Sequence, residues 1–449
     1  MSLPLKNILD QATLLDQKSV FTGLSTHPNS LGLNIIADRL NPQLDAHGIT
    51  RVSSITGYSD LLLPVWIAVR PNSKALSQSS GKSLTHTSAC IGACMESLEL
   101  ACAEEFRSSD RNLYSYLDLQ SSNCQVVDLD QYPLVTPLFA PSKPIHWTSA
   151  KHISHLLQPD SVCPDVLIPE KFCNLSFNSS DILPGFNNTS NGLASGFSML
   201  EATTQALLEL IERHCTTSCQ MGGLFKRVDV DTIPPSCRNL ITQIEKLGYT
   251  TRVLDATLFP SFPTYQFDFV PNSPDTQFTG GLGWGTHPNP EIALTRAIIE
   301  ANQARTIIIS GGRDDMPKSL YINEQLRNTP ASSLTVSTAE LPLSTISFED
   351  ASSFPLADYL PAIKDDLLSH GYPDIYFVEL SPPDSPVHVS KVFVPGMEGY
   401  LSHSYHPVNR SNYKGYMYGP HQFKSNLHEI KARLRQHRLI RLNAGGVGQ

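Results

Sequence analysis

Five glutamates in three helix-like segments carry the strongest chemical signal in this sequence. They form two pairs with i, i+3 spacing and one single residue: Glu96 and Glu99, Glu209 and Glu212, and Glu300. A pair with this spacing projects from one face of its helix. Carboxylates approach one another closely only when a cation neutralises them, and for the same reason they do not touch phosphates directly. The pattern therefore predicts magnesium carrying a nucleotide, held by carboxylates from several helices.

Three long helices must position these glutamates. We expect the first from about Thr85 to Phe106, the second from near Ser198 and the third from about Asn289. A charged helix face is usually a solvated one, so a single pair taken alone has an ordinary structural explanation. Glycines precede the second and third helices, and we interpret the run GGLGWG, Gly280 to Gly285, as a turn.

The rest of the chain predicts a mixed α+β protein. Strand-like segments occur at Ile67–Val69 and Thr251–Leu254, and the stretch from Tyr132 to Pro184 is rich in proline and serine, which is typical of loops with short strands. The first fifty residues show no clear pattern. Strands and helices alternate without the regular βαβ rhythm of a doubly wound sheet, so we expect mixed sheets with packed helices.

Composition narrows the class of protein. A chain of 449 residues is too long for one small core, and its length fits one large domain or several subdomains. A net charge of -9 argues against nucleic acid as the main partner. The sequence contains no apolar run of about 20 residues that would span a membrane. It starts without a secretory signal and has nine cysteines, an odd number that suits reduced thiols, so we expect a cytoplasmic protein.

Two glycine motifs are poor candidates for a phosphate-binding loop. Gly81-Lys82-Ser83 looks like the end of a P-loop, but the glycine needed five residues earlier is Leu76. The run GGLGWG lacks the spacing of a dinucleotide fingerprint and no βαβ unit surrounds it. The glutamates therefore predict an ATP-using enzyme without a P-loop.

The cysteines give no better site. Cys90 and Cys94 are spaced i, i+4, as are Cys215 and Cys219. Structural zinc sites usually carry tighter spacing in loops, so we interpret these thiols as small buried residues. Nothing in the sequence orients a cysteine nucleophile toward His287. We therefore assign no catalytic side chain.

The three glutamate segments also occur in the order typical of a known family. They read SGKSLTHTSACIGACMESLE from Ser80, SNGLASGFSMLEATTQALLELIER from Ser190, and GWGTHPNPEIALTRAIIEANQAR from Gly283, with VSKVFVPGMEGY from Val389 as a late strand and loop. From about Thr50 to about Tyr400 the chain resembles the YcaO family, enzymes that use ATP to activate backbone amides. The E-x7-E-x2-E-R run from Glu201 to Arg213 is the most specific part of the resemblance.

The resemblance implies a role for each of these positions. Glu96, Glu99, Glu209, Glu212 and Glu300 match magnesium ligands, and the nucleotide contacts match Glu201, Arg213 and Arg296, with Gln303 and Arg305 as weaker candidates. It also implies ATP and Mg2+ as cofactors and a YcaO-like fold that encloses a nucleotide site. We expect an N-terminal region over 1–75 and the YcaO domain over 76–449, with its catalytic core ending at about 405.

Two positions depart from the family pattern. The family usually has serine where this chain has Gly92, and asparagine where it has Phe197. Each change removes a polar contact near the nucleotide and would weaken ATP binding by on the order of 1 kcal/mol. Two alternatives therefore stay open. One is a YcaO-like scaffold or peptide-binding partner with weakened catalysis, and the other is an accessory factor in sulfur modification of a host protein.

The resemblance also bears on the product. The chain ends in RLNAGGVGQ, without the proline-rich tail common in the azoline-forming branch. The lead-in at Arg70-Pro71 and the GGRDD segment are more similar to YcaO proteins that act with a TfuA-type partner, which implies a thioamide rather than an azoline. We expect a ribosomally made peptide or protein as substrate, as in bacteriocin biosynthesis. We further expect a possible TfuA-type partner, a homodimer, and neither nucleic acid nor membrane as a partner.

Overall fold

The computed structural model of the chain describes residues 4–18, 31–109, 113–122, 124–134, 140–158, 160, 163–176, 185–186, 188–272, 280–313, 343–346, 356–399 and 408. Apart from Val408, the tail expected after about residue 405 lies outside these residues. So do Asp314 and Asp315 of the GGRDD segment. Within the described ranges, no helix is both long enough and apolar enough to cross a bilayer.

The N-terminal layer is a three-stranded antiparallel sheet with helices packed on it. The strands are β1 (Arg51–Ser54), β2 (Val65–Val69) and β3 (Gln78–Lys82), in the order β1-β2-β3. Helices α1 (Leu5–Asp16), α2 (Leu33–Ala46) and α3 (His86–Glu105) share one apolar core with this sheet. The first fifty residues, which showed no clear sequence pattern, thus contribute two amphipathic helices.

Helix α1 also completes the start of α3. The carboxylate of Asp16, the last residue of α1, accepts hydrogen bonds from the backbone N–H groups of His86 and Thr87 and from the Thr87 hydroxyl. These two N–H groups belong to the first turn of α3, where a helix has no partners of its own. The side chain of Asp16 therefore satisfies donors of a helix that begins 70 residues later.

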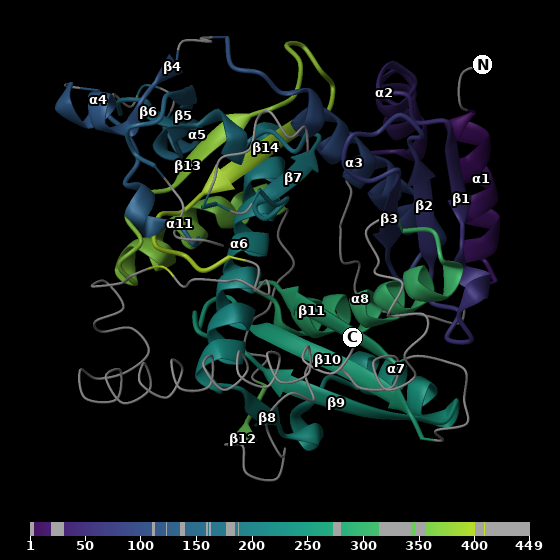
Figure 1. Cartoon of the computed structure of the whole chain (residues 1–449). Coiled ribbons are helices and arrows are strands. Elements are labelled where there is room, and N and C mark those ends of the chain that lie inside the picture. Colours follow the sequence, from purple (N-terminus) through teal and green to yellow (C-terminus); the bar gives the residue numbers. More distant parts are fainter. Residues whose placement is uncertain are drawn as a thin grey trace, which may run out of the picture.

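A six-stranded sheet lies on the left in Figure 1. Its order is β4 (Leu113–Tyr114), β5 (Ile145–His152), β13 (Tyr376–Glu379), β14 (His388–Phe393) and β7 (Leu193–Gly196), and β6 (Val166–Pro169) pairs with β5. All of these pairings are antiparallel. Short helices α4 (Tyr116–Ser121) and α5 (Ser154–Leu157) and the longer α11 (Leu360–Ser369) surround it. This sheet brings residues near 195 next to residues near 390.

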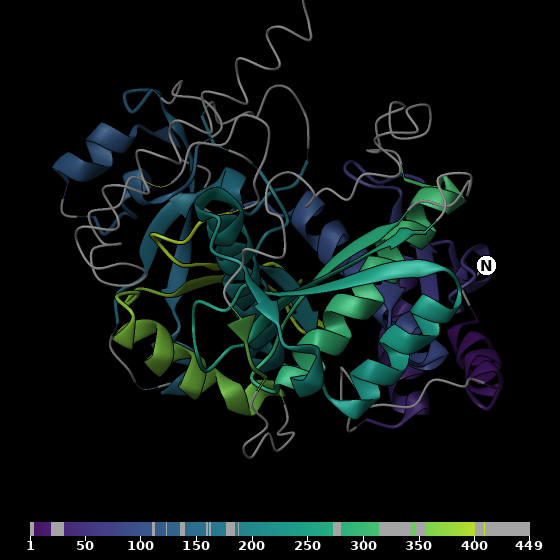
Figure 2. The same ribbon diagram turned by 90° about the horizontal axis from the view of Figure 1, so that it is seen from below.

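A five-stranded sheet lies at the bottom of the same view. Its order is β11 (Gly281–Thr286), β10 (Thr264–Pro271), β9 (Tyr249–Asp255), β8 (Lys226–Val228) and β12 (Leu343–Ser344), antiparallel except for the pair β8–β12. Figure 2 shows α7 (Pro235–Lys246) and α8 (Pro290–Ser310) on one face of this sheet. Phe267 and Phe269 of β10 pack with them in one core.

Helix α6 (Met199–Gly222) connects the parts of the molecule. It packs on β7 and β14 of the six-stranded sheet and on β11 and β10 of the five-stranded sheet, and it runs down the middle of Figure 1. Single-turn 3-10 segments complete the described chain: η1 (Thr56–Tyr58), η2 (Leu129–Gln131), η3 (Glu170–Phe172), η5 (Val230–Thr232) and η7 (Leu356–Tyr359). The three sheets and the helices among them confirm the α+β expectation.

The three glutamate-bearing helices begin where the sequence predicted. Each has a side-chain cap at the expected residue, where an oxygen accepts from a backbone N–H of the first turn: Thr85 for α3, Ser198 for α6 and Asn289 for α8. Such caps stabilise a helix start by roughly 1 kcal/mol. The boundaries of these helices could therefore be predicted from local sequence.

The interpretation of GGLGWG as a turn is wrong, because Gly281–Thr286 is the strand β11. A Cβ atom on Gly281, Gly283 or Gly285 would lie 2.1–2.3 Å from a backbone oxygen of α8. These alternate residues face the helix, so the missing side chains let α8 pack directly on the strand. Gly81 in β3 has the same relationship to α3, where a Cβ atom would lie 2.0 Å from the Ala89 carbonyl oxygen.

Candidate functional site

The five glutamates come together where α3, α6 and α8 meet. Helices α3 and α6 both pack on β7, and α6 and α8 both pack on β11. Each glutamate is within electrostatic reach of at least one other: Glu96 and Glu99 of Glu209, and Glu209 and Glu212 of Glu300. The structure therefore places in one cluster carboxylates that the sequence separates by up to two hundred residues.

Lys82 joins the cluster through Glu300. Its Nζ lies 2.7 Å from Glu300 Oε2, and the backbone N–H of Trp284 donates to Glu300 Oε1 at 3.3 Å. Burial alone would raise the pKa of Glu300, but the charges of Lys82 and Arg213 outweigh it and the pKa is lowered. Glu300 is therefore the member of the cluster that stays ionised through contacts with protein cations.

Glu99 is held by one serine at the far side of the cluster. Both the backbone N–H and the hydroxyl of Ser195 donate to Glu99 Oε1, at 2.8 and 2.7 Å. Burial, together with the charges of Glu96 and Glu209, raises the pKa of Glu99 to about 8, although these hydrogen bonds oppose the rise. At neutral pH this carboxyl thus carries a proton unless a cation replaces it.

Glu96 and Gln303 meet through Ser80 of β3. The backbone N–H of Ser80 donates to Glu96 Oε2 at 3.4 Å, while Gln303 Nε2 donates to the carbonyl oxygen and the hydroxyl of Ser80, at 2.8 and 3.0 Å. Burial raises the pKa of Glu96 in spite of the charges of Lys82 and Arg313. Gln303 therefore lies at the edge of the cluster and positions the strand that contacts Glu96, and its contact with the nucleotide stays a prediction.

Glu209 and Glu212 form the centre of the cluster. Burial raises the pKa of both, and it raises that of Glu212 to about 7, with Glu300 as a further cause. The charges of Arg213 and Arg296 act in the opposite direction on Glu212, which places both guanidinium groups near it. Arg296 also donates to Gln205 Oε1 at 3.4 Å.

Glu201 lies at the start of α6, and its Oε2 accepts from the backbone N–H of Phe197 at 2.8 Å. Burial raises the pKa of Glu201. The Phe197 ring packs on the N-terminal core, with the Arg39 guanidinium carbon 5.7 Å from its centroid. The position where the family usually has asparagine is thus filled by an apolar contact with the N-terminal layer.

Arg305 is placed differently from the other predicted residues. Its side chain is 0% exposed and forms an ion pair with Asp60 at 2.9 Å. It also donates to the Ser59 hydroxyl and to the Tyr249 hydroxyl, both at 2.7 Å. Ser59 and Asp60 directly follow η1, and Tyr249 is the first residue of β9. The guanidinium group therefore connects α8 to these two segments. The expectation that Arg305 contacts the nucleotide is therefore corrected to a structural role.

The chemistry of the cluster fits magnesium. Its donors are carboxylate oxygens, which Mg2+ prefers, without the sulfur or imidazole ligands typical of zinc. Burial and neighbouring carboxylates raise the pKa values of Glu99 and Glu212, so a bound cation would favour their ionised forms. In the described part of the chain, no group of three or more His, Cys, Asp or Glu side chains is already gathered as a metal site. The residues thus supply oxygen ligands for a magnesium ion, and their ionised forms require a cation nearby.

Several residues of the cluster were missed by sequence reasoning. Lys82 was considered only within a failed P-loop motif, and Ser80, Ser195 and Lys391 were not considered. Lys391 is an electrostatic neighbour of Glu209. One signal was present, because Lys391 lies between Val389 and Phe393 on an otherwise apolar face of its strand. A charged residue at such a position is seldom solvated.

The family assignment rests on the segments that build this cluster. A family model described as YcaO cyclodehydratase, ATP- and Mg2+-binding, matches residues 80–398. The chain belongs to the YcaO family. The match runs from Ser80, which contacts Glu96, to Glu398, just beyond β14. It confirms the expected family and its cofactors, ATP and Mg2+.

The chain is also similar in sequence to proteins from other organisms. A Rhizobium leguminosarum bv. trifolii protein from the tfuA 3′ region is 29% identical over 82% of this chain and 87% of its own length. A Methanothermobacter thermautotrophicus protein is 27% identical over 83% of this chain and 95% of its own length.

Solved structures share the fold of this YcaO chain. A YcaO protein from Methanopyrus kandleri, bound with AMPPCP and Mg2+, has a TM-score of 0.58 and 20% identity over 81% of this chain and 90% of its own. A heterocyclase in complex with substrate and cofactor has a TM-score of 0.61 and 19% identity over 87% of this chain. This chain spans 56% of that heterocyclase. At these identities the comparison shows the fold alone, which confirms the expected YcaO-like architecture.

Proposed function

We propose that this chain uses Mg-ATP to phosphorylate and so activate a backbone amide of a ribosomally made peptide or protein. One observation carries the proposal. The carboxylates of α3, α6 and α8 converge with Lys82, Arg213 and Arg296 in one cluster. Carboxylates for metal and cations for phosphate in one place suit a metal-bound triphosphate.

Amide activation explains why such a site needs ATP. Resonance makes a peptide carbonyl a poor electrophile. A thiol, hydroxyl or sulfide loses its proton and forms a bond to the carbonyl carbon, and the amide oxygen then takes the γ-phosphoryl group of ATP, which leaves ADP. Breaking the carbon–oxygen bond expels phosphate. The amide nitrogen of an azoline, or the added sulfur of a thioamide, then loses its remaining proton, which leaves a thiazoline, an oxazoline or a thioamide. The nucleophile comes from the substrate or from sulfide, so no protein side chain has to supply it.

Each part of the cluster has a separate task in this scheme. Glu96, Glu99, Glu209, Glu212 and Glu300 would hold the metal ions. When bound, Mg2+ would neutralise the triphosphate and the charge that develops during phosphoryl transfer. Arg213 and Arg296 offer planar, forked N–H donors to phosphate oxygens. Glu201, with its pKa raised by burial, is the proposed contact for the rest of the nucleotide.

For the product, we favour a thioamide over an azoline. The relative in the tfuA 3′ region and the lead-in at Arg70-Pro71 support a TfuA-type partner protein. Sulfide would then act as the nucleophile, and the substrate would need no cysteine, serine or threonine beside the modified amide.

The test combines ATP turnover with mass spectrometry. ADP release is measured with Mg2+, with and without candidate peptides and sulfide, for the parent, Glu209→Gln and the control Glu105→Gln. Glu105 lies on α3 but its side chain is 57% exposed. We expect turnover in the parent and control and none in Glu209→Gln. Exchange of oxygen for sulfur supports the thioamide, loss of water supports the azoline, and unchanged turnover in Glu209→Gln contradicts the site.

The packing of Phe197 favours one alternative strongly enough to test. Its ring lies against the N-terminal core, in a position where the family usually offers an asparagine. A chain that has lost a nucleotide contact there would serve as a scaffold or peptide-binding partner, or as an accessory factor in sulfur modification. Titration of the parent with Mg-AMPPCP separates the two functions. Absence of binding at millimolar nucleotide would favour the scaffold.

A further inference from the structure

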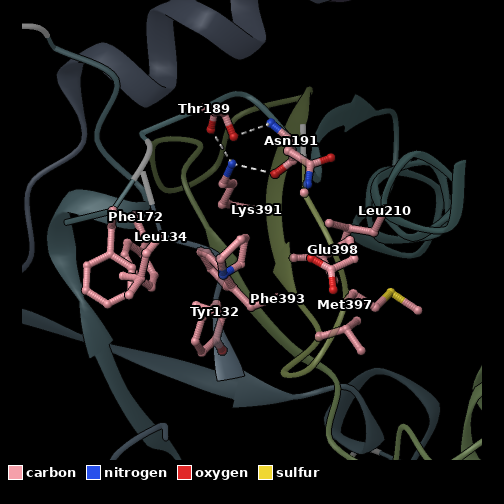
Figure 3. Close-up of a pocket in the computed structure, with 15 residues that line it drawn as sticks. Tyr132, Leu134, Phe172, Thr189, Asn191, Leu210, Lys391, Phe393, Met397 and Glu398 are labelled. Atoms are coloured by element: carbon pink, nitrogen blue, oxygen red, sulfur yellow. Dashed lines mark hydrogen bonds between the residues drawn. The ribbon is translucent and has the colours of Figure 1, made fainter. Parts of the chain in front are cut away.

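A cavity of about 90 Å³ lies beside β14 (Figure 3), and none of the five glutamates lines it. Its walls are mostly apolar and include Leu134, Phe172, Phe393 and Met397. Its polar side is formed by Thr189, Asn191, Lys391 and Glu398. A cavity with apolar walls and a few polar groups on one side is suited to a ligand that has both kinds of surface.

Lys391 is the buried cation on the polar side of the cavity. Its side chain is buried, and its Nζ donates to the carbonyl oxygens of Thr189 at 2.7 Å and Asn191 at 2.6 Å (Figure 3). An ammonium group has three N–H donors. Within the described ranges, the third has no hydrogen-bond acceptor and no carboxylate lies within ion-pair distance. A buried charge in this situation is costly, so an acceptor supplied by a ligand would stabilise it.

Strand register links this cavity to the glutamate cluster. Val389 of β14 is opposite Ser195 of β7, and Lys391 is opposite Leu193. Residues two apart on a strand share a face, so Ser195, which holds Glu99, and Lys391 lie on the same face of the sheet. One such step covers about 7 Å. A peptide with its amide at the cluster therefore needs only a short extension to reach the cavity.

We propose that this cavity is a subsite for the peptide substrate, in which an aliphatic side chain fills the apolar part and Lys391 donates to a carbonyl oxygen of the same peptide. The inference rests on the proposed function, since it assumes a peptide at the glutamate cluster. It adds a specificity site formed by Leu134, Phe172, Phe393 and Met397. It also gives Lys391 the task of positioning the substrate backbone.

The volume decides the class of side chain. A cavity of roughly 150 Å³ in another protein holds a benzene ring. The cavity here is smaller, at about 90 Å³, so a leucine-, isoleucine- or methionine-sized group fits better than an indole ring. Alanine would leave most of the space empty and would lose the apolar contacts.

The test uses three capped amino acids as probes: N-acetyl methylamides of leucine, alanine and tryptophan. Binding is titrated by ligand-observed NMR, with and without Mg-AMPPCP. The proteins are the parent, Leu134→Trp, which fills the cavity, and Lys391→Met, which removes the donors. Leu117→Trp and Lys364→Met are matched controls, because Leu117 is 49% exposed and Lys364 lies on α11, away from the cavity lining.

In the parent, we expect the leucine probe to bind at least fivefold more tightly than the other two probes. Leu134→Trp should abolish this preference and Lys391→Met should weaken leucine binding about tenfold, while both controls behave as the parent. Equal binding of leucine and alanine, or a preference that survives Leu134→Trp, would overturn the inference. If Lys391→Met does not fold, the Leu134→Trp result alone decides.

The nucleotide titration keeps the two proposals apart. If the parent binds Mg-AMPPCP but shows no preference among the probes, the subsite is wrong and the proposed function stands. If the parent shows the leucine preference but binds no Mg-AMPPCP, the proposed ATP-dependent function is wrong and the cavity remains a peptide-binding site.

Discussion

Lys82 and Glu300 form an ion pair with a distance of 2.7 Å between Nζ and Oε2, although 218 residues separate them in the chain. The pair joins β3 of the N-terminal layer to α8, which covers the five-stranded sheet. It also makes the cluster electrostatically uneven. The pKa of Glu300 is lowered, whereas the pKa of Glu99 is raised to about 8 by burial. The cluster thus has one carboxylate with a protein cation and others that require a metal ion.

This pair should be measurable as a coupling energy. Both side chains are about a quarter exposed, at 28% and 22%, so we expect a coupling of about 1 kcal/mol rather than the larger value of a fully buried pair. Urea unfolding of the parent, Lys82→Met, Glu300→Gln and the double variant gives this value. Single changes that add to within about 0.3 kcal/mol would show that the pair contributes no stability.

The strand glycines should be among the least replaceable residues of the fold. A Cβ atom on Gly283 would lie 2.3 Å from both the Ala297 oxygen and the Ala301 nitrogen. Because these are backbone atoms, α8 has to move, and we expect Gly283→Ala to cost about 3 kcal/mol or more. Gly57→Ala is the control, since nothing lies within 4 Å of its Cβ position. Equal unfolding midpoints for the two variants would contradict the role of β11.

The two departures from the family pattern should behave differently when they are reversed. A Cβ atom on Gly92 meets only Gly81 Cα, at an ordinary 3.6 Å, so Gly92→Ser should fold normally. If it restores a polar contact, Mg-AMPPCP affinity should rise about fivefold, which corresponds to roughly 1 kcal/mol. Phe197→Asn removes a ring packed on the N-terminal core, so it should lose about 1–3 kcal/mol of stability.

Calorimetric titration with Mg-AMPPCP, together with urea unfolding, separates these effects. If neither the Gly92→Ser variant nor a folded double variant binds Mg-AMPPCP more tightly than the parent, these two positions are not what weakens the site.

The pKa of Glu99 leads to a pH dependence with a definite sign. Its folded value of about 8 exceeds the ordinary 4.5, so the folded state binds the extra proton more tightly. The stability from this proton is fully present below pH 4.5 and is lost as the pH rises through 8. Without Mg2+, the parent should lose about 2–4 kcal/mol relative to Glu99→Gln between pH 5 and pH 9.

Urea unfolding at the two pH values measures this difference, with Glu105→Gln as the exposed control. Saturating Mg-AMPPCP should reverse the trend in the parent, because the cation replaces the proton. A parent and Glu99→Gln variant with the same pH dependence would show that Glu99 is ionised in the free protein.

The sequence predicted the three site helices well and the contacts between distant segments poorly. Caps at Thr85, Ser198 and Asn289 are local signals, so those helix starts were correct. The strand β11 was taken for a turn because glycine is usually depleted in strands. Its role depends on the approach of α8, which no local pattern contains. Likewise, Lys82 and Lys391 join the cluster only through sheet pairing and helix packing.

The misplacement of Arg305 had a signal in the sequence. Successive residues of an α-helix are turned by about 100°, so Arg305 lies about 140° around α8 from Glu300, on a different face. Gln303 is only about 60° away, and it does lie at the edge of the cluster. Two residues of the same motif therefore need not point in the same direction from the helix. Helix geometry alone distinguishes Gln303, which points toward the cluster, from Arg305, which does not.

The hydrogen bonds from α3 to Asp16 show that the segment that matches the family is shorter than the segment that holds α3 in place. The family match begins at residue 80, close to the division that we expected between residues 75 and 76. Yet α1 caps α3, and β2 pairs with β3. A protein started at residue 76 would keep every glutamate but lose Asp16, which caps α3, and β2, which pairs with β3. In this chain the segment that matches the family therefore depends on the N-terminal layer, which supplies the cap of α3 and the strand that pairs with β3.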